Sequence, residues 1–334
     1  MPAAGVFGKI PAQGDFVRLN ASTPAALAFD AFLQESLDGL RRTGGDLVPE
    51  PVRFAFFDAS GGTGVCGVFA PSRDSVGRSY PLSVFAPLAS ARDVAALPIV
   101  TRQFMEAAGE LLAEAESLGA PAIASRVRDL PGLSEDGAGG ETLRRLLDGT
   151  GAAWLWQTMF PDEPLPSAAY AVHTAKLACD SAGARASAGT GVILDCPTPN
   201  EPAALFWLAT VEALLGGGGG VGGGANGGGG GASAGPPAVA AAGWNGAVPA
   251  VAPSFFWSAS HGGRMLIALG RPPSSLLTYL TRPEASSTRL WPLATQIPAA
   301  RQSALRDIAP DLRQALASPD SSLLDVVEAL RPAP

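Results

Sequence analysis

A long glycine-rich tract between residues 216 and 243 is the feature that most limits how this chain can fold. Runs of Gly have no side chains to bury, and their backbone entropy is hard to offset. We therefore predict a flexible insert that spans about 30 Å root-mean-square by chain statistics. The tract contains no Lys, whereas a phosphate-binding loop ends in Lys followed by Ser or Thr. The tract thus interrupts a folded chain and does not form a nucleotide site.

The composition is that of a globular protein with few charges. Of the 334 residues, 47% are hydrophobic and 16% are charged, and the formal net charge is -7. A chain of this length can bury a sizeable core. The negative charge argues against binding to a nucleic-acid backbone, because such binding requires a basic surface.

The cysteines and the N-terminal residues indicate the compartment. Cys66, Cys179 and Cys196 lie far apart, and an odd, scattered set is typical of reduced thiols rather than of a disulfide framework. Residues 1–7 lack the basic start and long apolar run of a signal peptide. No stretch of about 18 uncharged apolar residues lies outside the glycine-rich tract. We expect a cytoplasmic protein that does not insert directly into a membrane.

The first helix is the best-marked element of secondary structure. Thr23 followed by Pro24 is typical of an N-cap and a first helical residue. Apolar residues then recur at helical spacing. The pattern ends at Gly44 and Gly45, which stop a helix.

The rest of the chain mixes strand and helix patterns. Short apolar or alternating runs predict strands at residues 52–57, 64–70, 80–86, 153–159, 191–196, 254–259 and 264–269. Helical spacing predicts helices at residues 102–117, 122–129, 141–148, 201–215, 274–280, 299–317 and 321–331. The first three strands are close enough to form an antiparallel meander, and the last two flank a turn at 261–263. Because strands and helices do not alternate strictly, we predict a mixed α/β (α+β) fold, a layered α/β/α sandwich around a mainly antiparallel or mixed sheet.

Few residues carry recognisable catalytic or metal-binding chemistry. His173 and His261 have no His or Cys neighbour at metal-ligand spacing. Outside the glycine-rich tract, the G-x-S-x-G pattern of a nucleophile elbow is missing as well. We therefore predict no metal, no cofactor and no catalytic residue.

Two short clusters stand out in a chain with so little charge. Residues 5–16 read G-V-F-G-K-I-P-A-Q-G-D-F, and residues 71–82 read P-S-R-D-S-V-G-R-S-Y-P-L. The residues alone favour structural turns, in which Asp15 and Asp74 cap the turns, Arg78 pairs with one of them and the glycines adopt positive φ. Loops mounted on rigid strands are also common binding positions, so a contact role stays open.

Both clusters resemble the signature motifs of the TagF family, also called ImpM, of type VI secretion-associated proteins. Residues 5–16 follow the family's pattern G-F-F-G-K-L-P-x-x-G-D-F, with conservative departures at Val6 and Ile10. Residues 71–82 follow its pattern P-S-x-D-x-V-G-R-x-x-P-L. A weaker likeness to the family's S-x-W-W segment occurs at residues 254–257.

The resemblance implies a compact layered α/β domain without catalytic activity. Proteins similar to TagF repress type VI secretion after translation, in some bacteria by binding a forkhead-associated (Fha) scaffold protein. We accordingly expect a non-enzymatic repressor whose partner is an Fha-type scaffold. We also expect a TagF-like domain over residues 1–282, interrupted by the flexible insert at 216–243, and a helical C-terminal extension over residues 283–334.

The motif positions are the candidate partner-binding or loop-bracing residues, namely Phe7, Gly8, Lys9, Pro11, Gly14, Asp15, Phe16, Pro71, Ser72, Asp74, Gly77, Arg78, Pro81 and Trp257. We favour a buried pair of Asp15 and Arg78 that braces two loops. One alternative is a hydrolase-like enzyme that uses Asp15 or Asp74 as acid or base and Arg78 to bind an anion. Another is a structural accessory subunit of the secretion apparatus, tethered through the insert.

Overall fold

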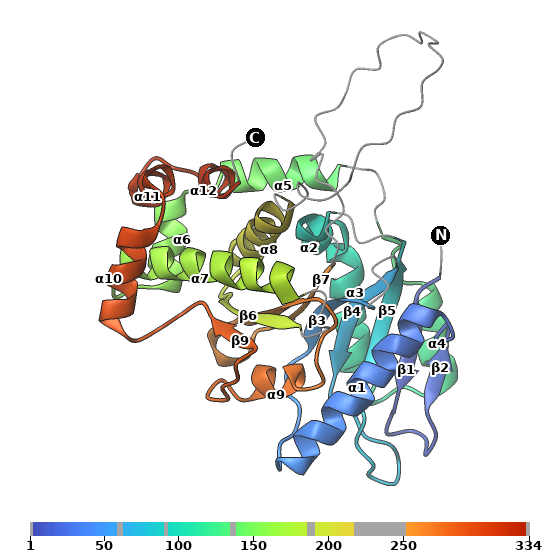
Figure 1. Cartoon of the computed structure of the whole chain (residues 1–334). Helices are drawn as coiled ribbons and strands as arrows, with labels where there is room; N and C mark the ends of the chain where they lie inside the picture. Colours follow the sequence, from blue (N-terminus) through green and yellow to red (C-terminus); the bar gives the residue numbers. More distant parts are fainter. Residues whose placement is uncertain are drawn as a thin grey trace, which may run out of the picture.

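One mixed sheet lies between two layers of helices in the computed structural model of the chain (Figure 1). The structure describes residues 3–58, 63–89, 93–133, 138–185, 191–216 and 252–331. The predicted fold class, a layered α/β/α sandwich around a mainly antiparallel or mixed sheet, is confirmed.

The sheet of the described segments has nine strands in the order β2-β1-β5-β4-β3-β7-β8-β6-β9. Their bounds are β1 Gly5–Gly8, β2 Val17–Leu19, β3 Val52–Phe57, β4 Gly64–Ala70, β5 Leu82–Leu88, β6 Val192–Pro197, β7 Pro253–Ser258, β8 Arg264–Leu269 and β9 Leu290–Pro292. All neighbouring strands are antiparallel except β6 and β9, which are parallel. The predicted meander is β3-β4-β5, and the predicted pair after the insert is β7-β8. The 3-10 helix η3 (Ser260–Gly262) lies in the connection between β7 and β8.

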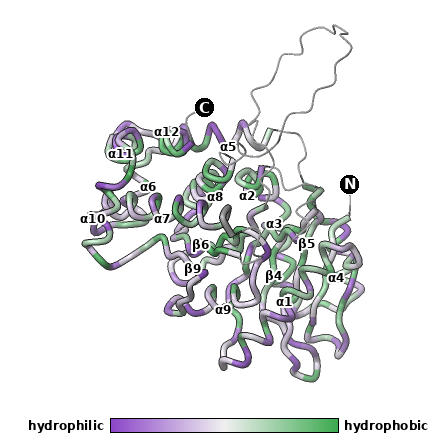
Figure 2. The backbone as a smooth tube through the Cα atoms, in the orientation of Figure 1, coloured by the Kyte–Doolittle hydropathy of each residue, from purple (hydrophilic) through white to green (hydrophobic). Residues whose placement is uncertain are grey.

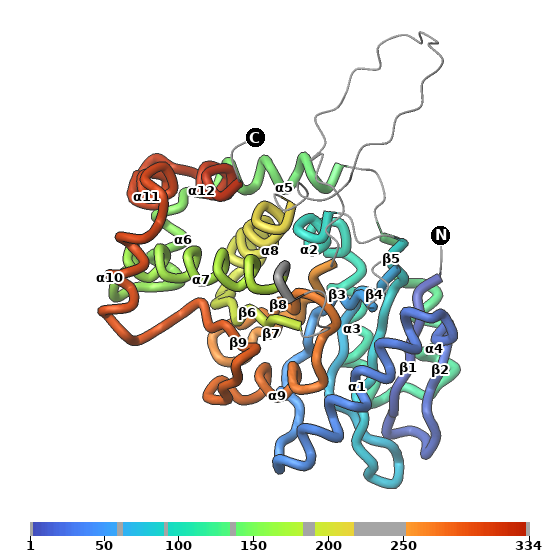
Figure 3. Tube along the Cα trace, viewed as in Figure 1, coloured from blue at the N-terminus to red at the C-terminus, as the bar shows by residue number. Residues whose placement is uncertain are grey.

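Strands from distant parts of the sequence meet at the centre of the sheet. β3 pairs with β7, so that Phe54 lies opposite Phe256, and Figure 3 shows this pair as a blue and an orange strand side by side. The residues before the glycine-rich tract and those after it therefore share one sheet.

A layer of aromatic rings joins one face of the sheet to α1 (Pro24–Arg42). As predicted, Thr23 caps this helix by accepting a hydrogen bond from the Ala26 N–H at 3.3 Å, and Pro24 is the first helical residue. Phe29 lies at the centre of the layer and is fully buried. Its ring contacts five others, those of Phe7, Phe32, Phe54, Phe56 and Phe69. The short helix α9 (Leu276–Thr281) packs beside α1 and completes this layer.

The opposite face of the sheet is covered by the other remaining helices, whose apolar residues form a second core. They are η1 Val94–Ala96, α2 Leu97–Val100, α3 Arg102–Glu114, α4 Ala120–Arg128, α5 Gly139–Asp148, α6 Ala152–Met159, α7 Pro164–Arg185, α8 Glu201–Gly216, α10 Pro298–Asp307, α11 Pro310–Ala317 and α12 Leu323–Ala329. α8 is apolar on most sides and buried, as predicted. In Figure 2 the central strands are mostly green, whereas the outer loops carry most of the purple. Side chains alternate between the two cores along β3, because successive residues of a strand point to opposite faces.

The strand predicted at residues 153–159 is wrong, because these residues form the helix α6. Aromatic residues favour strands on average, but this preference depends on packing. Ala152, Leu155 and Trp156 are buried at helical spacing, and the Trp156 ring meets the Phe206 ring edge-on at 5.0 Å. Packing against α8 thus decides the local structure.

The tail differs from the prediction at Pro310. One helix was expected over residues 299–317, whereas α10 ends at Asp307 and α11 begins at Pro310. Ala309 has an extended ψ of 147°, as expected for a residue that precedes Pro. Proline lacks the N–H that a continuous helix would need at this position.

The C-terminal residues pack onto the body of the fold. β9 pairs with β6, and α10, α11 and α12 contact α7, α8 and α5. The predicted boundary near residue 282 stays a prediction. The predicted flexible insert lies outside the described residues, apart from Gly216 at the end of α8. Within the described segments, no helix has both the length and the hydropathy needed to cross a membrane.

Replacing the central ring of the aromatic layer should weaken the whole fold. We expect Phe29→Ala to lower the free energy of unfolding by about 3–5 kcal/mol, because it leaves a cavity among five rings. The matched control is Leu27→Ala on the same helix. Leu27 is 50% exposed, and its replacement should change stability by about 0.5 kcal/mol or less. Denaturant unfolding of both variants measures the difference, and equal losses would contradict the central role of Phe29.

We expect the stability of the protein to depend on pH through Glu212, which lies on the face of the sheet opposite α1. Burial raises the pKa of this α8 carboxyl to about 7, and the nearby Asp93 charge acts in the same direction, although the Ala95 N–H donates to Glu212 at 3.0 Å. The native state thus binds the proton more tightly than the unfolded state, whose pKa is 4.5. The contribution of protonated Glu212 to the free energy of unfolding is complete below pH 4.5 and is lost as the pH rises to about 7.

We therefore expect Glu212→Gln, which mimics the neutral form, to become more stable relative to the parent as the pH rises from 5 to 8. Thermal unfolding at several pH values measures this difference. A difference between the two proteins that stays constant over this range would show that Glu212 ionises normally in the fold.

Candidate functional site

The two motif segments lie side by side at one end of the sheet. Residues 9–16 connect β1 to β2, and residues 71–81 connect β4 to β5, the neighbour of β1. Hydrogen bonds to two backbone carbonyls of the first segment help to join the segments: the Ser72 hydroxyl donates to the Lys9 carbonyl at 2.7 Å, and the Ser75 N–H donates to the Gln13 carbonyl at 3.1 Å. The sheet register therefore brings together motifs that are about 60 residues apart in sequence.

The 71–81 segment also closes on itself as a small hairpin. The Asp74 N–H donates to the Arg78 carbonyl at 3.1 Å, and the Tyr80 N–H donates to the Ser72 carbonyl at 3.0 Å. The turn between these bonds contains Gly77. These bonds fix the backbone from which the motif side chains project.

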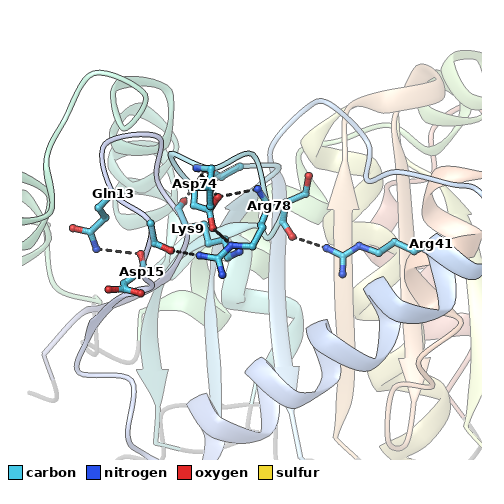
Figure 4. Close-up of polar contacts among 10 residues, drawn as sticks. Lys9, Gln13, Asp15, Arg41, Asp74 and Arg78 are labelled. Carbon is cyan, nitrogen blue, oxygen red and sulfur yellow. Dashed lines mark hydrogen bonds and ion pairs between the residues drawn. The ribbon is translucent and has the colours of Figure 1, made fainter.

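The Asp74 carboxylate is the centre of this site (Figure 4). Its Oδ2 accepts hydrogen bonds from Lys9 Nζ at 2.8 Å and from Arg78 Nε at 2.7 Å. Its Oδ1 accepts from the backbone N–H groups of Val76 at 3.1 Å and Arg78 at 2.8 Å. Asp74 and Lys9 are both buried. We call this arrangement of Lys9, Asp74 and Arg78 the Asp74 clamp.

The Asp74 clamp keeps its carboxylate ionised. Burial acts to raise the pKa of Asp74, but the hydrogen bonds from Lys9 and from the backbone and side chain of Arg78 outweigh it and hold this pKa well below its usual range. Hydrogen bonds that favour the charged form lower the pKa of a carboxyl. The negative charge of Asp74 is therefore permanent at neutral pH and ties the two segments together.

The prediction that Arg78 pairs with the Asp15 carboxylate is wrong. Arg78 pairs with Asp74 instead, and its guanidinium also donates to the Gly14 carbonyl. Asp15 is exposed, and Figure 4 shows its carboxylate turned away from Arg78. The first motif thus contributes a backbone carbonyl and Lys9 to the brace. The turn places Asp74 beside Arg78 by local hydrogen bonds, so this closer pairing prevails.

Two of the motif glycines have backbones that other residues rarely adopt. Gly8 has φ +138°, and a Cβ there would lie 2.1 Å from the Pro81 carbonyl oxygen. Gly77 has φ +87° in the hairpin turn. Gly14, in contrast, has no positive φ, and a Cβ there would meet only the Ser75 hydroxyl at 3.6 Å. The prediction of positive φ is confirmed for Gly8 and Gly77 and wrong for Gly5 and Gly14.

An aromatic pair extends the site toward α1. Phe16 is 39% exposed and meets the Tyr80 ring edge-on at 5.0 Å. Lys9 Nζ and Arg18 Cζ each lie 5.4 Å from the Phe16 ring centroid, within the range of cation–π attraction. Arg18 also pairs with Asp30 at 2.7 Å.

Sequence reasoning missed Tyr80, Asp30 and Arg41 as members of the site. The Tyr80 hydroxyl donates to the Asp30 carboxylate on α1, and burial together with this hydrogen bond raises the pKa of Tyr80. Arg41, at the end of α1, donates to the Ser79 carbonyl. Figure 4 shows Arg41 reaching from the helix toward the 71–81 segment. A basic residue in the last turn of a helix is common, because it interacts favourably with the helix dipole. The sequence pattern therefore gave no sign of this long-range contact of Arg41.

Three hollows meet around Arg41 and Tyr80, which line all of them. The largest, of about 510 Å³, lies between the end of α1, residues 45–49 and the 71–81 segment. A second hollow is lined by Lys9, Phe16, Arg41, Arg78, Ser79 and Tyr80. The third lies over Asp30 and Asp38 of α1. The motif segments therefore border a group of adjoining hollows.

The other predicted site residues have different positions. Phe7 and Pro81 are buried, Phe7 in the aromatic layer under α1. Pro11 and Pro71 are exposed on the rim of the largest hollow. Trp257 on β7 lies beyond β3, and the Arg53 guanidinium lies 5.3 Å from its ring centroid. Trp257 thus belongs to the sheet, away from the two motif segments.

Comparisons with known proteins match one family model and include a similar solved structure. Residues 5–130 match the TagF N-terminal domain, described as type VI secretion system-associated. The crystal structure of PA0076 from Pseudomonas aeruginosa PAO1 is similar at 28% identity, with a TM-score of 0.35. That match covers 40% of this chain and 64% of that one, which is less than two thirds of its length. No curated protein matches the chain.

Removing the central charge should loosen both motif segments. We expect Asp74→Asn to destabilise the fold clearly, because it leaves the buried Lys9 ammonium without its anion. The control Asp15→Asn changes an exposed carboxylate and should alter stability by about 0.5 kcal/mol or less. The advantage of the parent over Asp74→Asn should narrow as the pH falls below 3.8, the ordinary pKa of Asp74. Thermal unfolding of the three proteins tests this, and similar stabilities at neutral pH would contradict the clamp.

Proposed function

With a TagF N-terminal domain over residues 5–130, this chain is a type VI secretion-associated protein of the TagF family, and we propose that it is a post-translational repressor of that secretion system. The domain match is the observation that carries this proposal. Repression would proceed by protein–protein binding in the cytoplasm rather than by catalysis.

The site supports a binding role. The Asp74 clamp fixes the loops before any partner arrives, and fixed loops lose little conformational entropy on binding. The same loops expose apolar side chains, since Val76 is 69% and Phe16 is 39% exposed. Exposed apolar residues on rigid loops next to a hollow are typical of a protein-binding surface.

We propose an Fha-type scaffold protein as the partner. The resemblance to TagF supports this choice, because such proteins bind that scaffold in some bacteria. A nucleic-acid partner fits the chain poorly, since its net charge is -7 and phosphate backbones require basic surfaces. In this scheme the chain holds the scaffold away from the membrane-bound part of the secretion apparatus.

The clamp chemistry favours a non-enzymatic role over the hydrolase alternative. A general base must accept a proton from a substrate, whereas both Asp74 oxygens already accept hydrogen bonds from Lys9, Val76 and Arg78. Asp15 is exposed and turned away from Arg78. A carboxylate held in this way acts as a structural anchor.

Secretion assays test the repressor role directly. We expect deletion of the gene to raise secretion of the tube protein and overexpression to lower it, because the repressor removes free scaffold. Overexpressed Asp15→Asn should still repress, whereas overexpressed Asp74→Asn should repress less once the amounts of folded protein are matched.

A pull-down with the Fha-type scaffold from the same strain completes the test. The parent chain should retain the scaffold. Unchanged secretion in both the deletion and the overexpression strain would overturn the repressor role. Repression without scaffold retention would overturn the choice of partner.

A further inference from the structure

We propose that the largest hollow binds an extended segment of the partner protein in which an acidic residue lies next to a bulky apolar one. We call this hollow, between the end of α1, residues 45–49 and the 71–81 segment, the α1 groove. The proposal rests on the proposed function in one respect, that the chain binds another protein. It adds the place and the chemistry of the contact.

The α1 groove is built to receive apolar side chains. Its floor contains Leu37, Leu40 and Tyr80, all of them buried from bulk water to 8% exposure or less. Burial of a Leu or Phe side chain in such a place is favourable by about 1.5–3 kcal/mol. A volume of about 510 Å³ has room for a few side chains and lies in the usual range for ligand pockets.

Prolines make the rim of the α1 groove stiff. Pro11, Pro49 and Pro71 line it and are exposed, and each has its φ fixed by its ring. The Asp74 clamp holds the segments that carry Pro11 and Pro71. The rim therefore loses little conformational entropy when a partner segment binds.

The α1 groove adjoins a hollow lined by three cations. Lys9, Arg41 and Arg78 line that hollow, and none of its lining residues is a carboxylate. The hollow shares Arg41, Ser79 and Tyr80 with the α1 groove. The groove therefore passes directly from an apolar part to a cationic part.

Arg41 and Arg78 keep donors free for an incoming carboxylate. Their side chains are 47% and 62% exposed. Arg41 is engaged with the Ser79 carbonyl and, at 3.5 Å, with Asp38. Arg78 uses its guanidinium for Asp74 and the Gly14 carbonyl. Each guanidinium has five N–H donors, so both can still bind a carboxylate.

The surrounding charges limit the partner to a single acidic side chain at this point. Asp46 and Glu116 line the other parts of the α1 groove together with the rim cation Arg73, and Asp30 and Asp38 lie nearby on α1. A long acidic stretch would meet these carboxylates and be repelled. A segment with one acidic residue beside an apolar one matches the charge pattern along the groove.

Site-specific photocrosslinking identifies what the α1 groove binds. A photoreactive phenylalanine analogue replaces Pro49 or Arg73, two exposed rim residues, in the full-length chain inside cells. The matched control carries it at Leu177, which is 44% exposed on α7. We expect both rim positions, but not Leu177, to crosslink to one segment with Asp or Glu within two residues of Leu, Ile, Phe or Met.

A second set of variants tests the cationic end. We expect Arg41→Glu to reduce the crosslink at least tenfold, whereas Arg42→Glu should retain it. Arg42 is the next residue of α1, exposed, and lies outside the lining of the groove. Arg41→Gln serves as a milder variant, and melting temperatures confirm that all three variants fold.

Binding of a synthetic peptide closes the test. A fluorescein-labelled peptide of the crosslinked segment should bind the full-length chain, and changing its acidic residue to the amide should weaken binding at least tenfold. A peptide with Lys in place of its acidic residue should bind the Arg41→Glu variant of the chain, because the two charges are then exchanged. A crosslinked segment without an acidic residue, or equal binding of acid and amide peptides, would overturn the proposal.

The outcomes separate this proposal from the proposed function. Crosslinking of an acidic–apolar segment from a protein outside the secretion system supports the α1 groove and contradicts the Fha-type partner. If the pull-down retains the scaffold but only the Leu177 position crosslinks, the result supports the Fha-type partner. The same result overturns the proposal that the α1 groove binds the partner segment.

Discussion

The fixed position of one buried carboxylate underlies the arrangement of the whole motif surface. Asp74 accepts four hydrogen bonds, from two cations and two backbone N–H groups. Lys9 is one of only two lysines in a sequence with 23 basic residues, and an ammonium is a compact charge that a buried site can pair with one anion. Neither ion could stay buried alone, so each one holds the other's segment in place. Loop shape and charge are thereby set together.

Tyr80 connects this charged centre to the hydrophobic core. Its ring packs against Phe16 and forms part of the floor of the α1 groove, while its hydroxyl donates to Asp30 on α1. The same helix carries Phe29 into the aromatic layer and Arg41 to the Ser79 carbonyl. The stability of the core and the shape of the surface therefore depend on the same helix, and the two cannot change independently.

Sequence patterns predict this fold well where one local rule decides the outcome. The Thr23 cap, the β3-β4-β5 meander and the buried helix α8 follow from capping and apolar spacing. The strand prediction at 153–159 was wrong because the packing of Trp156 on Phe206 overrides aromatic strand preference. The motifs located the site, but they could not show that Arg78 selects Asp74 over Asp15. That choice depends on the hairpin geometry. The contact of Arg41 with the Ser79 carbonyl depends on how α1 crosses the sheet.

The pairing of β3 with β7 also sets the order in which the chain can finish folding. A ribosome releases residues 52–57 long before residues 253–258, so β3, which carries Phe54 and Phe56, emerges with one edge unpaired. Open edges of apolar strands attract other chains, and nascent proteins aggregate through such surfaces. The glycine-rich tract is made during this interval and lengthens it. Cells that produce this protein therefore face a risk during translation that ends only when β7 closes the sheet.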